Sequence, residues 1–260
     1  MPISDLPSFV DITESFPAIK PDILLGNGFS RSLDNRFAYE DLLTAANFGD
    51  RDQAYRDLFE QLNTSDFEHV VKGIQEAKLI SQSIIDDIDP NAYDNAAATI
   101  SDGLRDALVN NHISRCDDVD GNKLRACKEW LDLFQRVFTT NFDLLLYWVS
   151  AKTALQLHFN DQLKDGFGTD EHYAGLRTHP SSNTGRQNLF YLHGAMHLFK
   201  KRAVTEKLRY NNGGAIRDQI DERINEQRFP LIVIGGNSAQ KISAIGSSPY
   251  LSHCYRRFCK

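Results

Sequence analysis

The sequence lacks any segment that would place it in a membrane or mark it for secretion. No stretch approaches the roughly 18 uninterrupted apolar residues that a membrane helix needs. The first 20 residues carry Asp5, Asp11 and Glu14 and have no basic region followed by an apolar one, as a secretory signal would. We therefore expect a cytoplasmic protein with no membrane partner.

An excess of positive charge is also missing. The net charge is −6 and the sequence pI is near 5.7, whereas binding to a phosphate backbone needs a basic surface. Nucleic acid is therefore not an expected partner. The 260 residues are 41% hydrophobic and 25% charged, which suits one large domain or a core with an inserted subdomain.

Metal-binding patterns are absent as well. The cysteines are too widely spaced for the paired ligands of a zinc ribbon, so reduced, structural thiols are the default. His193 and His197 are four residues apart, but Gly194 follows the first and no Glu lies between them as in a zinc protease. We expect no metal. The cysteines are Cys116, Cys127, Cys254 and Cys259.

Three short motifs are present, each beginning where an apolar, strand-like run gives way to small or polar residues. If these runs are neighbouring parallel strands, the polar groups converge at the carboxyl edge of one sheet, where open α/β folds bind ligands. The motifs are Leu24–Ser30, Phe138–Asp143 and Tyr191–Gly194.

The first motif contains Gly26 and Gly28 in a tight turn of the type that brings backbone N–H groups to a pyrophosphate. We expect a positive φ at Gly28 and open space for the phosphates there, with a hydroxyl hydrogen bond from Ser30. The third glycine of the dinucleotide fingerprint is missing, so a plain turn from strand to helix remains an alternative.

The second motif places Thr139, Thr140, Asn141 and Asp143 where a strand enters a helix. One of these residues is expected to cap the helix, because Thr, Asn and Asp all satisfy free helix N–H groups. The amide of Asn141 is suited to hold ribose hydroxyls or a water molecule. Asp143 is suited to orient that water or to contact the ribose.

The third motif places His193 at the end of a buried run, before Gly194. Cleavage of the bond between nicotinamide and ribose releases a neutral base from a cationic pyridinium, so the leaving group needs no proton. An imidazole with a pKa near 6.5 can instead take the proton of water or of a ribose hydroxyl. A purely structural histidine is the alternative. We expect Asn141 and His193 to project into the cleft, so that alanine at either position costs little stability.

The hydrophobic pattern predicts an α/β protein, Rossmann-like, with a mostly parallel sheet and a large helical insertion. Residues 1–38 hold the first strand and the glycine turn, 39–134 the helical insertion, and 135–260 the remainder of the domain. Residues 161–188 have the composition of a long loop. The predicted strands are Asp22–Leu25, Arg136–Thr139, Leu155–Phe159, Leu189–Leu192 and Leu231–Ile234. The predicted helices begin near Tyr39 and then span 54–62, 67–85, 93–112, 123–134, 143–155, 216–227, 238–245 and 250–258.

From Asp22 to Phe258 the chain resembles the sirtuin-like superfamily. It is most similar to a bacterial branch that includes a family of formally unknown function and contains NAD-consuming phage-defence effectors. The resemblance implies NAD as substrate and Asn141 and His193 as the catalytic pair. The segment 235–251 also resembles that bacterial family, without a role assigned to it. The resemblance also implies a cofactor-binding set of Gly26, Asn27, Gly28, Phe29, Ser30, Thr139, Thr140 and Asp143.

Two departures from this family matter. The four-cysteine zinc module of protein-deacylating sirtuins is missing, which argues against deacylation. Sirtuin-like domains also continue to further strands, whereas this sequence stops at Lys260 after a predicted helix. We therefore expect a homo-oligomer, or a partner protein, to cover the adenosine side.

The expected function is an NAD+ glycohydrolase that releases nicotinamide and ADP-ribose, as an NAD-depleting anti-phage defence effector. The alternative is a catalytically silent sensor of NAD or ADP-ribose. An NAD-dependent deacylase or ADP-ribosyltransferase comes third.

Overall fold

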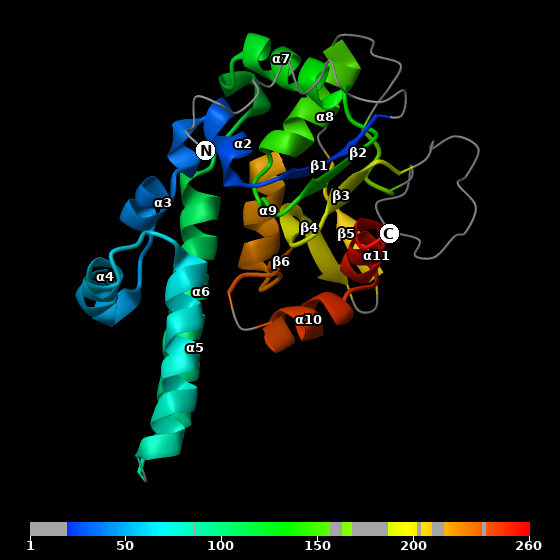
Figure 1. Cartoon of the computed structure of the whole chain (residues 1–260). Helices are drawn as coiled ribbons and strands as arrows, with labels where there is room; N and C mark the ends of the chain where they lie inside the picture. Colours follow the sequence, from blue (N-terminus) through cyan, green and yellow to red (C-terminus); the bar gives the residue numbers. More distant parts are fainter. Residues whose placement is uncertain are drawn as a thin grey trace, which may run out of the picture.

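The computed structural model describes residues 20–85, 87–156, 163–167, 187–201, 204–209, 216–235 and 238–260. Within these ranges the chain is a mixed α/β protein in which helices surround two small sheets (Figure 1). None of the described helices is both long and apolar enough to cross a membrane.

The first sheet is parallel and carries the three motifs. Its strands are β1 (Asp22–Leu25), β2 (Arg136–Thr139) and β3 (Leu189–Tyr191), in the order β1-β2-β3. Leu25 pairs with Thr139, and Thr139 pairs with Tyr191, so the three strands end side by side. This confirms the expected juxtaposition of the three motifs at one carboxyl edge.

The second sheet is antiparallel, and the sequence did not predict it. It contains β4 (Gly194–Lys201), β5 (Val204–Lys207) and β6 (Pro230–Ile232) in the order β5-β4-β6. The prediction of one mostly parallel sheet is therefore wrong for this half. The chain leaves the parallel sheet after Tyr191 and turns at Gly194, so the strand predicted at Leu231–Ile234 pairs with β4 in antiparallel orientation.

The segment between β1 and β2 is helical, as predicted. Asp66 caps α5 through the N–H groups of Glu68 and His69, and Asp89 caps α6 ahead of Pro90. These two helices pack side by side as a long hairpin that projects away from the sheets (Figure 1). The helices are α2 (Asn27–Leu33), α3 (Tyr39–Ala45), α4 (Asp52–Gln61), α5 (Phe67–Ile84), α6 (Pro90–Asn111) and α7 (Gly121–Leu131), with short 3₁₀ helices at Asn35–Phe37, Gly49–Arg51 and Cys116–Asp118.

The remaining helices follow the sheets. Leu155 belongs to α8, so the strand predicted at Leu155–Phe159 is wrong at its start, and its last three residues lie outside the described part. Most of the predicted loop 161–188 also lies outside it, and the described parts of that segment contain no helix or strand. The helices are α8 (Leu145–Gln156), α9 (Ile216–Asn225), α10 (Ser238–Gly246) and α11 (Pro249–Phe258).

Candidate functional site

The carboxyl edge of the parallel sheet joins the first two motifs through direct hydrogen bonds. Asn141 Nδ2 donates to the carbonyl oxygen of Gly26 at 2.9 Å and to Ser30 Oγ at 2.7 Å. The Ser30 hydroxyl in turn donates to Asp143 Oδ2 at 2.5 Å. Four residues predicted as site residues thus form one hydrogen-bonded cluster, which we call the Ser30 cluster: Gly26, Ser30, Asn141 and Asp143.

The side-chain amide of Asn141 is bound within this cluster, which the sequence did not indicate. Its amide nitrogen has two hydrogens, and both are directed at protein acceptors on the glycine turn. The residue is buried. Removal of the amide would leave Ser30 and Gly26 without these bonds, so we now expect a substitution here to cost stability, whereas the sequence alone indicated little loss.

The glycine turn is the start of helix α2. Gly26 is the N-cap with a φ of −111°, and a glycine has no side chain to satisfy the N–H groups of the first turn. The expected positive φ at Gly28 is wrong, because this residue already lies inside the helix. A Cβ at either glycine would meet nothing within 4 Å, so the space in front of the turn is open.

The other residues that we expected to bind NAD mainly stabilise the fold. Phe29 is buried and stacks on Trp130 with ring centroids 6.4 Å apart, and Asn27 is half-buried in the first turn. Thr139 Oγ1 accepts a hydrogen bond from the N–H of Asn141 at 3.0 Å. The N–H of Thr140 donates to the carbonyl oxygen of Leu25 at 3.1 Å, which continues the pairing of β1 and β2.

Asp143 supplies the expected cap, since its Oδ1 accepts from the N–H of Leu145 at the start of α8. Burial raises the pKa of its carboxyl group, while the hydrogen bonds from Ser30 and Leu145 act in the opposite direction. The carboxylate thus stabilises the local structure and holds the Ser30 hydroxyl in place.

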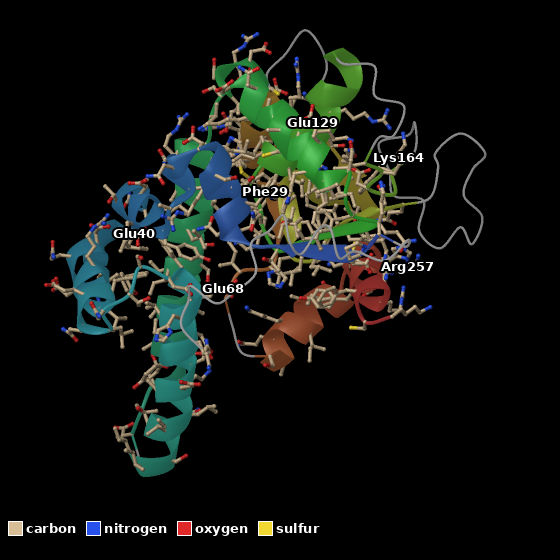
Figure 2. All side chains as sticks on the ribbon, turned by 45° about the horizontal axis from the view of Figure 1, so that its top comes forward. Phe29, Glu40, Glu68, Glu129, Lys164 and Arg257 are labelled. Atoms are coloured by element: carbon tan, nitrogen blue, oxygen red, sulfur yellow. The ribbon has the colours of Figure 1, made fainter. Side chains whose placement is uncertain are left out.

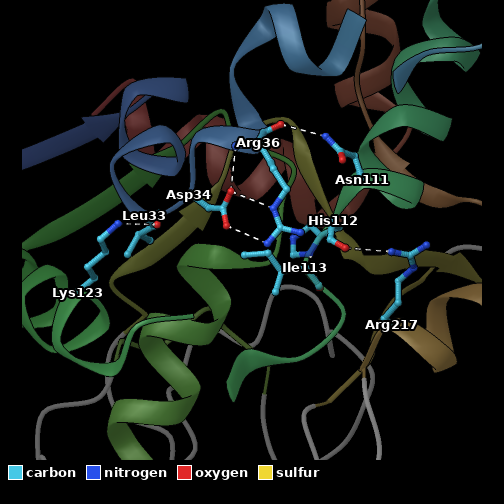
Figure 3. Close-up of polar contacts among 8 residues, drawn as sticks. All are labelled: Leu33, Asp34, Arg36, Asn111, His112, Ile113, Lys123 and Arg217. Carbon is cyan, nitrogen blue, oxygen red and sulfur yellow. Dashed lines mark hydrogen bonds and ion pairs between the residues drawn. The ribbon is translucent and has the colours of Figure 1, made fainter. Parts of the chain in front are cut away.

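A buried histidine that the sequence analysis did not select supports the same segment. His112, which follows α6, accepts a hydrogen bond from the N–H of Leu144 through Nε2 at 2.9 Å, and its Nδ1 lies 2.8 Å from the carbonyl oxygen of Ile113. Figure 3 shows Arg217 of α9 donating to the carbonyl oxygen of His112 at 3.3 Å. Asn111 also donates to the carbonyl oxygen of Arg36 at 3.2 Å. These bonds join the helical segment to the site.

The third motif forms the corner between the two sheets. Gly194 has a φ of +82°, and a Cβ there would lie 1.8 Å from the carbonyl oxygen of Leu231. Only glycine fits this position. Next to it, the carbonyl oxygen of His193 accepts from the N–H of Val233 at 2.9 Å. Gly194 is therefore structural, and it places the half-buried His193 at the corner.

The His193 ring has its own set of neighbours. Its Nε2 lies 2.9 Å from the Tyr255 hydroxyl on α11, and its ring is nearly parallel to that of Phe142, with centroids 6.3 Å apart. Burial lowers the pKa of His193, Glu68 raises it and Lys241 lowers it. The ring is therefore neutral at neutral pH. No hydrogen bond links His193 with Asn141 in the described part of the chain.

A cavity of about 460 Å³ lies between α5, α6, the end of β6 and α10. Val71, Gln75, Ile234 and Lys241 are among its lining residues, and none of the described residues that we expected to bind NAD lines it. Lys241 connects the cavity with the corner, because it pairs with Glu68 at 2.6 Å and its charge acts on His193. Figure 2 labels Glu68 at the start of α5.

Sequence reasoning missed Glu68, Tyr255 and His112. Tyr255 and His112 make hydrogen bonds to the site, and the charge of Glu68 acts on His193. Each comes from a helix or helix end far along the chain, and no local pattern marks such a relationship. Among the described residues, no three His, Cys, Asp or Glu side chains gather as metal ligands would.

Comparison with the curated proteins gives no match. The family described as "Domain of unknown function (DUF4917)" matches residues 23–260, which is nearly the whole sequence, and the chain therefore belongs to that family.

Proposed function

We propose that this protein is an NAD+ glycohydrolase that releases nicotinamide and ADP-ribose. The observation that carries the proposal is the parallel order β1-β2-β3, which brings a glycine turn, an amide with a carboxylate, and a histidine to one sheet edge. Ligands bind at this edge in open α/β folds. The Rossmann-like character of this half and its relationship to sirtuin-like proteins are part of the proposal.

The pyrophosphate lies in front of the glycine turn in this proposal. The space there is open at Gly26 and Gly28. At the start of α2 the N–H of Phe29 bonds to the carbonyl oxygen of Gly26 at 3.0 Å, whereas the N–H groups of Asn27 and Gly28 have no intrahelical acceptor. Ser30 and Asn141 hold the turn in place from behind. The cavity bordered by Lys241 has the volume of a small-molecule site and receives one end of the dinucleotide.

The reaction needs a nucleophile and stabilisation of an oxocarbenium-like ribose. The bond between C1′ and the pyridinium nitrogen breaks, its electron pair leaves with neutral nicotinamide, and water adds to C1′. His193 takes the proton of that water, because its pKa is lowered by burial and its ring is neutral. The Ser30 cluster holds the residues that contact the ribose and the phosphates in fixed positions.

The test is incubation of the full chain with NAD while free nicotinamide and ADP-ribose are measured by chromatography. His193→Gln should lower kcat by about 10²-fold or more, as loss of a positioned base does. The matched control is His69→Gln, which replaces an exposed histidine on α5. Equal rates in the His193 variant and the wild type would remove His193 from catalysis.

A second candidate function is a catalytically silent sensor of NAD or ADP-ribose. It is favoured by one observation, which is that both amide hydrogens of Asn141 are used within the protein. Calorimetry separates the two functions. A sensor binds NAD and leaves it intact over hours, whereas the glycohydrolase consumes it.

Depletion of cellular NAD follows from the first function if the protein resides in the cytoplasm. A role in anti-phage defence belongs to the same proposal. Its test is the NAD content of cells that express the wild type or His193→Gln, with and without phage infection. Equal NAD content in all four cultures would contradict the proposed role.

A further inference from the structure

The tip of the helical hairpin exposes large apolar side chains. Helices α5 and α6 pack side by side and project away from both sheets (Figure 1). On the last turns of α5 and directly after its end, four apolar residues are between 50% and 74% exposed. We call them the α5 patch: Leu79, Ile80, Ile84 and Ile85. A contiguous apolar patch of this kind on a projecting element is typical of an interaction surface.

The inner face of α5 is already occupied by α6. Lys78 of α5 pairs with Asp94 of α6 at 2.7 Å. Further towards the tip, the Tyr93 hydroxyl of α6 donates to Ser81 Oγ of α5 at 3.0 Å. The α5 patch lies on the opposite, outer side of the helix, so α6 does not cover it.

The outer face of α5 has an order of charges that suits a second copy of itself. Its exposed residues follow one another at helical spacing, so they form one row along the helix. A basic residue precedes the apolar part of the row, and an exposed acidic residue follows it in the connection to α6. The row is Lys72, Glu76, Leu79, Ile80, Ser83 and Ile84, with Asp87 after the end of the helix.

An antiparallel contact between two copies of this row matches apolar with apolar positions and opposite charges with each other. In a two-fold contact, when residue i of one copy faces residue j of the other, j also faces i. An axis between Leu79 and Ile80 places these two side chains against each other. The same spacing places Lys72 beside Asp87 of the second copy. A parallel contact would instead set Lys72 against Lys72, and like charges repel.

We propose that the outer face of α5 is a homodimer interface in which two hairpins pack antiparallel about a two-fold axis near Leu79 and Ile80. The second copy covers the α5 patch, so the four apolar side chains of each chain leave water. The pairs of Lys72 with Asp87 at both ends of the contact fix its orientation. None of these residues binds NAD in our proposal, so this inference does not rest on the proposed function.

Sedimentation equilibrium of the full chain at a series of concentrations tests the interface. We expect the wild type to follow a monomer–dimer equilibrium. Leu79→Lys places a charge at the centre of the α5 patch and should raise the dissociation constant of the dimer by about 30-fold or more. The matched control is Leu133→Lys, which changes an exposed leucine that follows α7 and should leave the dissociation constant unchanged.

Exchange of charges tests the antiparallel arrangement. Lys72→Asp and Asp87→Lys each set like charges together at both ends of the contact and should raise the dissociation constant by about 10-fold. The double variant restores opposite charges and should return it to within about 3-fold of the wild-type value. Both positions are exposed, so the fold tolerates the changes. Circular dichroism checks this in every variant.

A wild-type chain that stays a monomer at every soluble concentration would overturn the inference. A dimer that persists unchanged in Leu79→Lys would do the same, because the contact would then lie on another surface. If the double charge variant does not recover the affinity, the antiparallel arrangement is wrong. A monomer that co-sediments with phosphatidylcholine vesicles, but not after Leu79→Lys, would assign the α5 patch to a lipid surface instead.

Discussion

The N–H of Leu144 donates to Nε2 of the buried His112, and this bond fixes the segment that carries Asn141 and Asp143. The ring can accept at Nε2 only when its hydrogen is on Nδ1, which lies 2.8 Å from the carbonyl oxygen of Ile113. Both nitrogens are thus satisfied in a single neutral form. A second proton would break the bond to Leu144, and burial lowers the pKa of His112 to about 4.

The first prediction is that the free energy of unfolding decreases as the pH is lowered below neutrality, because of His112. Its folded pKa lies below its unfolded value of 6.5, so the unfolded chain takes the proton first. This contribution is complete above pH 6.5 and is lost as the pH falls towards 4. Urea unfolding should show a loss of about 2 kcal/mol between pH 7.5 and pH 5 from this group.

The His112→Gln variant isolates that effect, since glutamine can also donate and accept but does not titrate in this range. Its free energy of unfolding should depend less on pH by about the same 2 kcal/mol. His69→Gln on the exposed side of α5 is the control and should keep the wild-type slope. Identical slopes in wild type and His112→Gln would show that His112 does not titrate as described.

The second prediction concerns the Ser30 cluster. Ser30→Ala and Asn141→Ala should each cost about 1–3 kcal/mol in free energy of unfolding, because each leaves buried polar partners unsatisfied. In the double variant the costs should not add, and the coupling should exceed about 0.5 kcal/mol. Chemical denaturation of the four proteins measures this cycle. Additive costs would mean that the two side chains do not act together.

The third prediction contrasts two glycines of the motifs. Gly194→Ala should destabilise the protein by about 3 kcal/mol or more, because a Cβ would collide with the carbonyl oxygen of Leu231 at a positive φ. Gly28→Ala should keep or raise the melting temperature, because Gly28 lies in a helix and faces open space. A stable, soluble Gly194→Ala protein would contradict the close approach of Gly194 to Leu231 of β6.

The fourth prediction tests whether the open space at Gly28 is a phosphate site. Gly28→Val should weaken NAD binding by about 10-fold or more without unfolding the chain, since the side chain would occupy the proposed position of the pyrophosphate. Calorimetry with NAD measures the affinity. Glu129→Val, at an exposed position of α7, is the control for the effect of adding a valine to the surface. Unchanged affinity in folded Gly28→Val would make the turn purely structural.

The fifth prediction concerns His197 in β4. It is fully buried, stacks on Tyr147 with ring centroids 4.5 Å apart, and has no hydrogen-bond partner for either nitrogen within the described ranges. His197→Phe keeps the stacking and removes two unsatisfied groups, so stability should stay equal or rise by about 1 kcal/mol. Thermal unfolding measures this. A clear loss of stability would indicate a partner for His197.

Much of the site could be predicted because it depends on local pattern. The apolar runs that end at Leu25, Thr139 and Tyr191 gave three parallel strands in the correct places, and helical periodicity gave the segments that become α3 to α7. A cap by one of the Thr, Asn and Asp side chains of the second motif was also expected from residue type, and Asp143 supplies it. These features need only a few neighbouring residues, which a sequence displays directly.

The second sheet could not be predicted in this way. The residues of β4 from Gly194 to Phe199 are buried on both faces, so they show no alternation of apolar and polar positions. The sequence therefore did not predict a separate strand after the His-Gly motif. Tyr255 and Glu68 were missed for another reason. Tyr255 of α11 contacts His193, and the charge of Glu68 on α5 acts on it; both relationships depend on tertiary packing.

The most direct test of the central claim is proton magnetic resonance of NAD incubated with the wild-type chain, followed in real time at several protein concentrations. We expect NAD to disappear while nicotinamide and ADP-ribose accumulate in equal amounts, and we expect His193→Gln to slow the accumulation of both products by about 10²-fold or more. NAD that stays intact beside folded wild-type protein, at every concentration, would contradict the assignment of this sheet edge as a glycohydrolase site.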